Sequence, residues 1–110
     1  MTPAIHSTPA ALAALAAFAL ACGASPAQAQ DNKLARSLAA TCANCHGTNG
    51  NARSAMATLA GKPAEQIVAA FNGFKSGQLP ATVMHQISKG YTDAQVQLIA
   101  TYFAAQKPAP

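Results

Sequence analysis

The sequence of 110 residues contains no tryptophan and little charge, since charged residues make up only 9% of it. All 7 Lys and Arg and all 3 Asp and Glu lie from Asp31 onward, so the first thirty residues carry no charged side chain. The basic residues are scattered and form no cluster, which gives no support to nucleic-acid binding. The chain also lacks an internal repeat and any long strand-like alternation, so we expect helices.

The charge-free N-terminal part has the organisation of a cleavable signal peptide. Its apolar run, residues 10–21, is 12 residues long, whereas a membrane-spanning helix needs roughly 20. Gly23 and Pro26 break a helix after this run. The triplet Ala27-Gln28-Ala29 then fits the A-x-A pattern that signal peptidase cuts.

We therefore predict export to the periplasm, with a signal peptide at residues 1–29, one domain at residues 30–110 and no membrane span. Lipoprotein processing at Cys22 is the alternative. A lipobox prefers a larger aliphatic residue three positions before the cysteine, where this sequence has Ala19.

Residues 30–110 hold every charged side chain, a net charge of +4 and two of the three cysteines, Cys42 and Cys45. A domain of this size closes one small core and commonly depends on a metal, a disulfide or a cofactor. Its first predicted helix begins at Asp31 or Asn32 and carries Leu34, Leu38 and Cys42 on one face.

The rest of the domain is also predicted to be helical, with loops between the helices. Residues 47–60 form a loop of small and polar residues, and a second helix runs from Pro63 to about Gly77. Residues 80–90 are a short helix or helical loop. Thr92 and Gln95 cap a last helix that buries one face until the chain nears residue 108. The apolar faces of the second and last helices are Ile67, Val68, Phe71 and Phe74, and Val96, Ile99, Ala100 and Phe103.

The chemistry of the sequence lies in Cys42-Ala43-Asn44-Cys45-His46, the C-x-x-C-H signature of covalent haem c attachment. Cysteines three apart on a helical turn face the same side, so both thiols can add to the two vinyl groups along one edge of a porphyrin. His46 then lies below the ring, where an imidazole nitrogen can bind iron as the proximal ligand. We expect its other nitrogen to donate to a backbone carbonyl within residues 51–55. The motif predicts one haem c.

A C-x-x-C pair also occurs in thioredoxin-type dithiols, structural disulfides and zinc sites. A redox dithiol belongs to a βαβ context that this sequence lacks, and zinc needs two further ligands. His85 is one candidate, and no other cysteine survives removal of the leader. The adjoining His46, the export signal and the small helical chain favour haem over these alternatives.

The sixth iron position separates electron transfer from catalysis at the haem. Met56, Met84 and His85 are the candidates in residues 30–110. Met84 lies in a short segment between two turn regions, where a thioether can approach the opposite face of the ring and raise the reduction potential. We predict Met84 as the distal ligand, Met56 as core filler and His85 as a surface or edge histidine. Ligation by either of the latter, or an open site, is the alternative.

From about Leu34 to Gln106 the sequence resembles the class I cytochromes c, in which N-terminal and C-terminal helices cross around a haem held by C-x-x-C-H and a distal methionine. Residues 45–51, 73–77, 82–84 and 87–91 read CHGTNGN, GFKSG, TVM and ISKGY. They are similar to the haem-bearing cytochrome subunit of flavocytochrome c sulfide dehydrogenases. The best-known form of that subunit has two haem domains, whereas this sequence has one attachment motif, so it would match a single-haem form.

The resemblance implies an all-α domain with thioether anchors at Cys42 and Cys45 and iron ligands at His46 and Met84. It also implies a periplasmic electron-transfer subunit that serves a sulfide-oxidising flavoprotein and passes electrons to a soluble acceptor. The chain supplies no constellation of acid, base and nucleophile, so we expect it not to be an enzyme by itself. A diffusible carrier that feeds an oxidase or reductase is one alternative, and a peroxidase or gas-binding haem with an open distal site is another.

Overall fold

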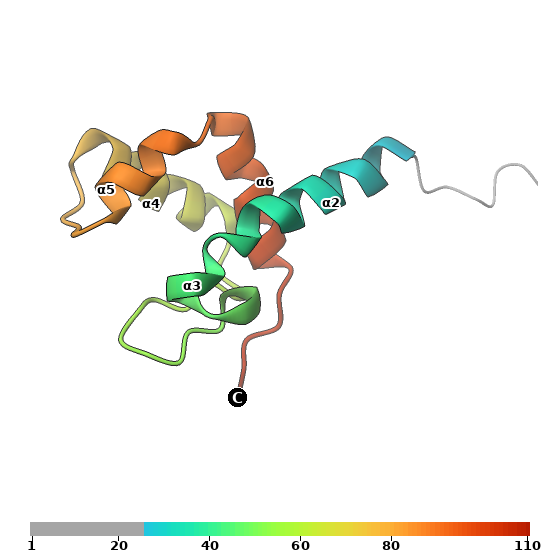
Figure 1. Cartoon of the computed structure of the whole chain (residues 1–110), viewed down its shortest axis with the longest axis horizontal. Coiled ribbons are helices and arrows are strands. Elements are labelled where there is room, and N and C mark those ends of the chain that lie inside the picture. The colour runs from blue at the N-terminus through green and yellow to red at the C-terminus, as the bar shows by residue number, and fades with distance from the viewer. Residues whose placement is uncertain (1–25) are drawn as a thin grey trace, which may run out of the picture.

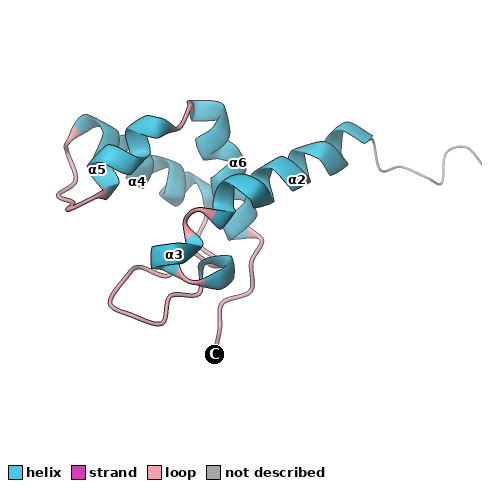
Figure 2. Ribbon diagram, in the orientation of Figure 1, coloured by secondary structure: helices cyan, strands magenta, loops and turns pink. Residues whose placement is uncertain are grey.

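The computed structural model describes residues 26–110, and all regular structure in this range is helical (Figures 1 and 2). This confirms the predicted all-α fold class. The predicted signal peptide lies outside the described residues except for residues 26–29, and no helix within residues 26–110 is long and apolar enough to cross a membrane. The elements are α2 (Pro26–Ala40), α3 (Ala43–His46), the 3-10 turn η1 (Thr48–Gly50), α4 (Ala64–Ser76), α5 (Met84–Ile87), the 3-10 turn η2 (Ser88–Gly90) and α6 (Asp93–Ala104).

Helix α2 already includes Pro26, the first described residue, so the predicted cap, Asp31 or Asn32, lies inside the helix and the predicted start is wrong. The expected cleavage site lies inside α2, where residues 27–30 are exposed. Cleavage after Ala29 would therefore remove none of the core residues of the described chain.

Helix α2 crosses α6, and the two helices make the most extensive contact between elements of the described chain (Figure 1). The residues that α2 buries are Ala35 and Ala39, whereas Leu34 is 47% exposed. The predicted stripe is therefore wrong at Leu34, whereas Leu38 and Cys42 are partly buried and pack against the core beside the two alanines. Small side chains at the crossing let the two backbones approach closely, since the distance between helix axes depends on the residues in contact.

Helix α6 supplies much of the hydrophobic core. The predicted capping box is present: Gln95 N–H donates to Thr92 Oγ1 at 3.2 Å, and Thr92 N–H donates to Gln95 Oε1 at 2.9 Å. Both bonds satisfy N–H groups that a helix start would otherwise leave without partners. The predicted buried face is confirmed for Val96, Ile99, Ala100 and Phe103.

Helix α4 packs against α6 and adds Ile67 and Phe71 to the same core. It spans Ala64–Ser76, with Pro63 as its N-cap instead of its first helical residue and Gly77, whose φ of 78° lies in the left-handed region, as its C-cap, so the predicted bounds hold to within one residue. The chain then returns through α5 and η2, which both contact α4 (Figure 1). The predicted short helix in residues 80–90 is thus held against the helix that adds Ile67 and Phe71 to the core.

Candidate functional site

The C-x-x-C-H motif forms a continuous helical turn directly after α2. Cys42 N–H donates to Ala39 O at 3.1 Å, and the N–H groups of Cys45 and His46 donate to Cys42 O at 3.2 and 2.9 Å. The spacing of the motif, with Cys42 as the N-cap of α3, therefore brings both thiols and the imidazole toward one side of the chain, as the sequence predicts.

All four predicted site residues, Cys42, Cys45, His46 and Met84, line one cavity of about 710 Å³. Its volume falls in the range of about 300–1,000 Å³ that is usual for cofactor pockets. The walls are the C-x-x-C-H turn, part of the loop in residues 55–59, one face of α4 and the segment of residues 80–91. Most lining side chains are apolar, among them Leu59, Ile67, Phe71, Phe74, Val83 and Ile87.

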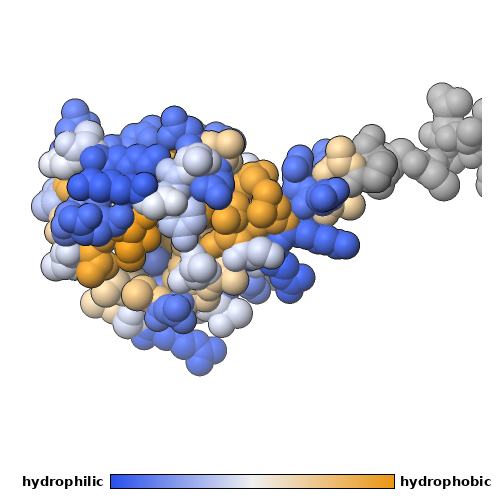
Figure 3. Space-filling view, turned by 45° about the horizontal axis from the view of Figure 1, so that its top comes forward, coloured by the Kyte–Doolittle hydropathy of each residue, from blue (hydrophilic) through white to orange (hydrophobic). Residues whose placement is uncertain are grey.

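Part of the cavity wall is apolar surface that the protein leaves exposed. Met56, Val83 and Ile87 are 50%, 51% and 43% exposed, and all three line the cavity. In the space-filling view, apolar residues gather in patches between hydrophilic ones (Figure 3). A large, flat, apolar group bound in the cavity would cover these side chains, so the wall fits a porphyrin.

The imidazole of His46 is oriented by a backbone carbonyl. Its Nδ1 lies 2.7 Å from Ala57 O, and because a carbonyl only accepts, Nδ1 carries the proton and donates. Nε2 is then the unprotonated nitrogen that can bind a metal ion. The predicted hydrogen bond exists, but its acceptor lies beyond the expected residues 51–55. The first residues after the motif form the 3-10 turn η1, and only the later part of the loop, at Ala57, lies next to His46.

Gly50 closes the base of the loop that carries Ala57. Its carbonyl accepts the N–H groups of Leu59 at 2.8 Å and Ala60 at 3.2 Å. Its φ is 77°, and a Cβ at this position would lie 2.7 Å from a ring carbon of Phe103. Glycine is required here because it tolerates positive φ and has no side chain. The loop next to His46 is thereby fixed to the core.

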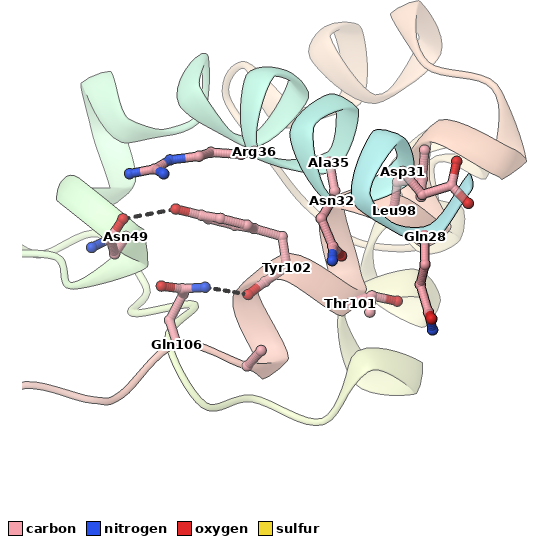
Figure 4. A pocket seen from close by; sticks show the side chains of 11 residues that line it. Gln28, Asp31, Asn32, Ala35, Arg36, Asn49, Leu98, Thr101, Tyr102 and Gln106 are labelled. Atoms are coloured by element: carbon pink, nitrogen blue, oxygen red, sulfur yellow. Dashed lines mark hydrogen bonds between the residues drawn. The ribbon is translucent and has the colours of Figure 1, made fainter. Parts of the chain in front are cut away.

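Helix α6 also holds the start of this loop, through Tyr102 (Figure 4). The Tyr102 hydroxyl donates to Asn49 Oδ1 at 2.8 Å, and Gln106 Nε2 donates to the Tyr102 carbonyl at 2.7 Å. These three residues line a second hollow of about 590 Å³, between α2 and α6, whose lining shares no residue with the first cavity. Residues that line the second hollow therefore support the loop, although this hollow is separate from the cavity that the predicted site residues line.

The side chain of Asn51 binds the chain segment that follows α6. Its Nδ2 donates to Lys107 O at 3.2 Å, and its Oδ1 accepts the N–H of Ala109 at 2.6 Å. Both polar atoms of the amide are thus used to join residues far apart in the sequence. The loop after His46 is held at its start, at its base and by the segment after α6.

Met84 and Met56 both line the cavity, from different segments. Met84 is the first residue of α5, where the N–H groups of Gln86 and Ile87 bond to Val83 O, and it packs against the hydrophobic core. Met56 lies in a bend without regular structure and is 50% exposed, so the expectation that it fills the core is wrong. Because Met84 is held by a helical turn and by packing against the core, it remains the predicted distal ligand.

His85 stays outside the cavity that its neighbour Met84 lines. It is half-buried, which agrees with an edge histidine, and its Nδ1 is a buried atom without a hydrogen-bond partner in residues 26–110. The structure therefore separates His85 from the residues that gather around the C-x-x-C-H turn.

Two residues that the sequence does not single out, Thr41 and Tyr91, link the motif to the opposite wall. Their hydroxyl oxygens are 2.7 Å apart and share a hydrogen bond, and the Tyr91 ring packs edge-on against Phe71 with centroids 6.0 Å apart. Tyr91 lies in the ISKGY segment, and the chemistry of the motif alone gives no signal for either contact.

Burial raises the pKa of the Cys42 thiol, an effect that the nearby Cys45 adds to and that a hydrogen bond with Thr41 opposes. Cys42 is thus kept as a neutral thiol over a wider pH range than an ordinary cysteine. Within residues 26–110, Cys42 and Cys45 are both free, and no group of three or more His, Cys, Asp and Glu could hold a metal ion. The described chain therefore contains neither the disulfide nor the zinc ligand set of the alternative interpretations.

Two thiols, an oriented imidazole and a methionine around one apolar cavity, in a small all-helical fold, define the class of c-type cytochromes. No family model matches the chain. The chain is 46% identical, over 66 residues, to the cytochrome subunit of sulfide dehydrogenase from Chlorobaculum tepidum, a match that covers 60% of each protein. It is 33% identical, over 64 residues, to cytochrome c-553 from Desulfomicrobium norvegicum, which covers 56% of this chain and 80% of that protein.

The chain belongs to the family of small c-type cytochromes that includes cytochrome c-553. Electron transport is the role of this family, and haem c is the cofactor that it implies. The predicted resemblance to the cytochrome subunit of sulfide dehydrogenase is confirmed, although the chain spans only 60% of the length of that relative.

Proposed function

We propose that the chain is a periplasmic electron-transfer cytochrome of one domain, residues 30–110, that carries a single haem c and is not an enzyme by itself. Cys42 and Cys45 would be the thioether anchors, and His46 and Met84 the axial ligands. The observation that carries this proposal is His46: its Nδ1 is held by a carbonyl 2.7 Å away, in the wall of a cavity that both thiols and Met84 also line. When bound, haem c supplies a one-electron couple between ferric and ferrous iron.

Attachment needs no oxidant. Each thiol adds its S–H bond across one vinyl double bond, with the sulfur joining the carbon next to the ring and the hydrogen joining the outer carbon. The haem is then expected to stay with the denatured polypeptide in acidified organic solvent, and the mature mass to equal residues 30–110 plus one haem. The double variant Cys42→Ala, Cys45→Ala should release its haem. Free extraction from the wild type contradicts the attachment, and a mass that includes residues 1–29 contradicts the leader.

We propose further that the chain is the haem subunit of a sulfide-oxidising flavocytochrome c. The identity of 46% to the cytochrome subunit of a sulfide dehydrogenase supports this assignment. Oxidation of hydrogen sulfide ion to zero-valent sulfur releases two electrons and one proton. The flavin of a separate chain would take the electron pair, and this chain would receive the electrons one at a time and pass them to a soluble acceptor.

The partner is tested by mixing the purified cytochrome with the flavoprotein. The cytochrome alone should not turn over sulfide, because six-coordinate iron offers no open site. With the flavoprotein, sulfide should reduce the haem and a complex should persist through gel filtration, since stable interfaces usually bury more than about 1,000 Å². The absence of a complex, together with equal reduction by unrelated donors, would contradict the subunit assignment.

A freely diffusing carrier is the second candidate. It is favoured by the match to cytochrome c-553, of which the chain covers 80%, a larger share than the 60% of the sulfide dehydrogenase subunit. A carrier would exchange electrons with several donors and elute as a monomer in the same gel-filtration experiment. The haem chemistry and the site residues are the same for both candidates.

A further inference from the structure

We propose that Lys62 and Gln66 form the end of the cavity that receives the haem propionates, and that the charge of Lys62 raises the reduction potential of the haem. This inference rests on the proposed attachment at Cys42 and Cys45. It adds a binding role for two residues that lie outside the C-x-x-C-H motif and away from the axial ligands.

Lys62 is the one Lys or Arg among the residues that line the cavity in the described chain. Two other polar side chains of the lining are already engaged, since Thr41 bonds to Tyr91 and His46 bonds to Ala57 O, whereas Thr82 belongs to the wall of residues 80–91. Within residues 26–110, neither the Lys62 ammonium nor the Gln66 amide has a hydrogen-bond partner. Near the start of α4 the cavity therefore presents one cation and one amide that can still bind an anionic group.

The residues on the cavity side of α4 place these two groups at one end. Gln66, Ala70 and Phe74 follow one another at four-residue spacing on α4 and line the cavity, and Lys62, two residues before the helix, lines it as well. Residues at this spacing lie one above the other along a helix, so the row is polar where α4 begins and apolar where it ends. The Lys62 and Gln66 end is the polar one.

Because the thioethers would hold one edge of the porphyrin at Cys42 and Cys45, they determine which edge is left to face Lys62 and Gln66. The vinyl groups belong to two neighbouring pyrrole rings and the propionates to the other two, so anchoring the vinyl edge at Cys42 and Cys45 directs the propionates to the far side. The acidic residues of the described chain, Asp31, Glu65 and Asp93, are all outside the cavity lining. Two carboxylates are thus expected where a lysine and an amide are available and no acidic side chain lines the wall.

A cation at the propionates favours the reduced haem, because reduction adds one negative charge to the site. At a separation of about 10 Å and an effective dielectric between that of a protein surface and that of water, one unit charge changes the ratio of ferrous to ferric haem about three- to tenfold at a fixed potential. A tenfold change corresponds to a shift of about 59 mV for a one-electron couple.

The test is a potentiometric titration of the haem-loaded protein at low ionic strength. Lys62→Gln should lower the ferrous-to-ferric ratio about three- to tenfold, and Lys62→Arg should restore it. Lys33→Gln is the matched control, because it removes the same charge from an exposed position on α2 outside the cavity and should change the ratio less than twofold. Gln66→Glu, which adds an acid at the same end, should shift the ratio in the same direction as Lys62→Gln.

A second measurement needs no variant. In the wild-type holoprotein, a lysine held by a carboxylate should react with an acetylating reagent more slowly than Lys33, as mapped by mass spectrometry. Equal shifts for Lys62→Gln and Lys33→Gln, or equal acetylation of the two lysines, overturn the inference while the haem stays attached. Loss of haem from the wild type contradicts the proposed attachment itself, which a spectrum and a mass reveal before any titration.

Discussion

Replacing Gly50 by alanine tests whether the loop beside His46 depends on the core. The glycine combines a φ of 77° with close neighbours: an added Cβ would lie 2.7 Å from a ring carbon of Phe103 and 2.8 Å from Ala60 N. The left-handed conformation costs a residue with a side chain about 1–2 kcal/mol. Forcing a methyl group into a packed site costs about 1–3 kcal/mol more. Gly50→Ala should therefore lower the free energy of unfolding by about 2–5 kcal/mol.

Gly77 provides the matched control, because its φ is 78° and a Cβ there would meet no atom within 4 Å. Gly77→Ala should lose only the backbone contribution, about 1–2 kcal/mol. The difference between the two variants isolates the contact with Phe103 and Ala60. Guanidinium unfolding of the haem-loaded protein, followed by circular dichroism and fitted with one common m-value, measures both losses. Equal losses for the two variants would refute the claim that the loop base is packed on the core.

Two further predictions concern the sulfur atoms of the site. Met84→Ala should open the sixth iron position, so that the ferrous protein binds carbon monoxide readily and the weak far-red band of the ferric form disappears, whereas Met56→Leu should leave both properties unchanged; the reverse result would make Met56 the ligand. In the haem-free chain, burial raises the pKa of the Cys42 thiol and so lowers the fraction present as thiolate, and Cys42 should be alkylated more slowly than the exposed Cys45. Equal rates for the two thiols in the absence of denaturant would contradict the burial of Cys42.

The parts of the fold with strong local signals could be predicted from the sequence. Helix α6 has a capping box at Thr92 and a regular apolar face, and α4 has Pro63 at one end and Gly77 at the other. In both helices local and tertiary preferences agree, so their bounds and buried faces follow from the pattern. Helix α2 differs, because its contact face is set by a close crossing that selects Ala35 and Ala39, and alanines have no periodic signal in an alanine-rich segment.

The site, like the fold, could be predicted from the sequence only in part. The attachment motif specifies its chemistry because C-x-x-C-H requires particular residues at a fixed spacing. The Ala57 carbonyl could not be chosen in advance, since every residue offers a carbonyl and the choice depends on the path of an irregular loop. Gln66 on α4 and Lys62 just before this helix could be chosen only once the structure shows which face of α4 meets the cavity.

The two hydrogen bonds of the Asn51 side chain make the loop next to His46 depend on residues that are synthesised much later. The amide of Asn51 lies just beyond the C-x-x-C-H turn, while its partners, Lys107 O and Ala109 N, follow α6. A ribosome, or an export channel that releases the chain from its N-terminal side, delivers the motif well before the segment that braces its loop. During synthesis and export the thiols would therefore be presented before the loop next to them is braced. The support that Asn51 gives to the loop beside His46 would be acquired only after the whole chain has emerged.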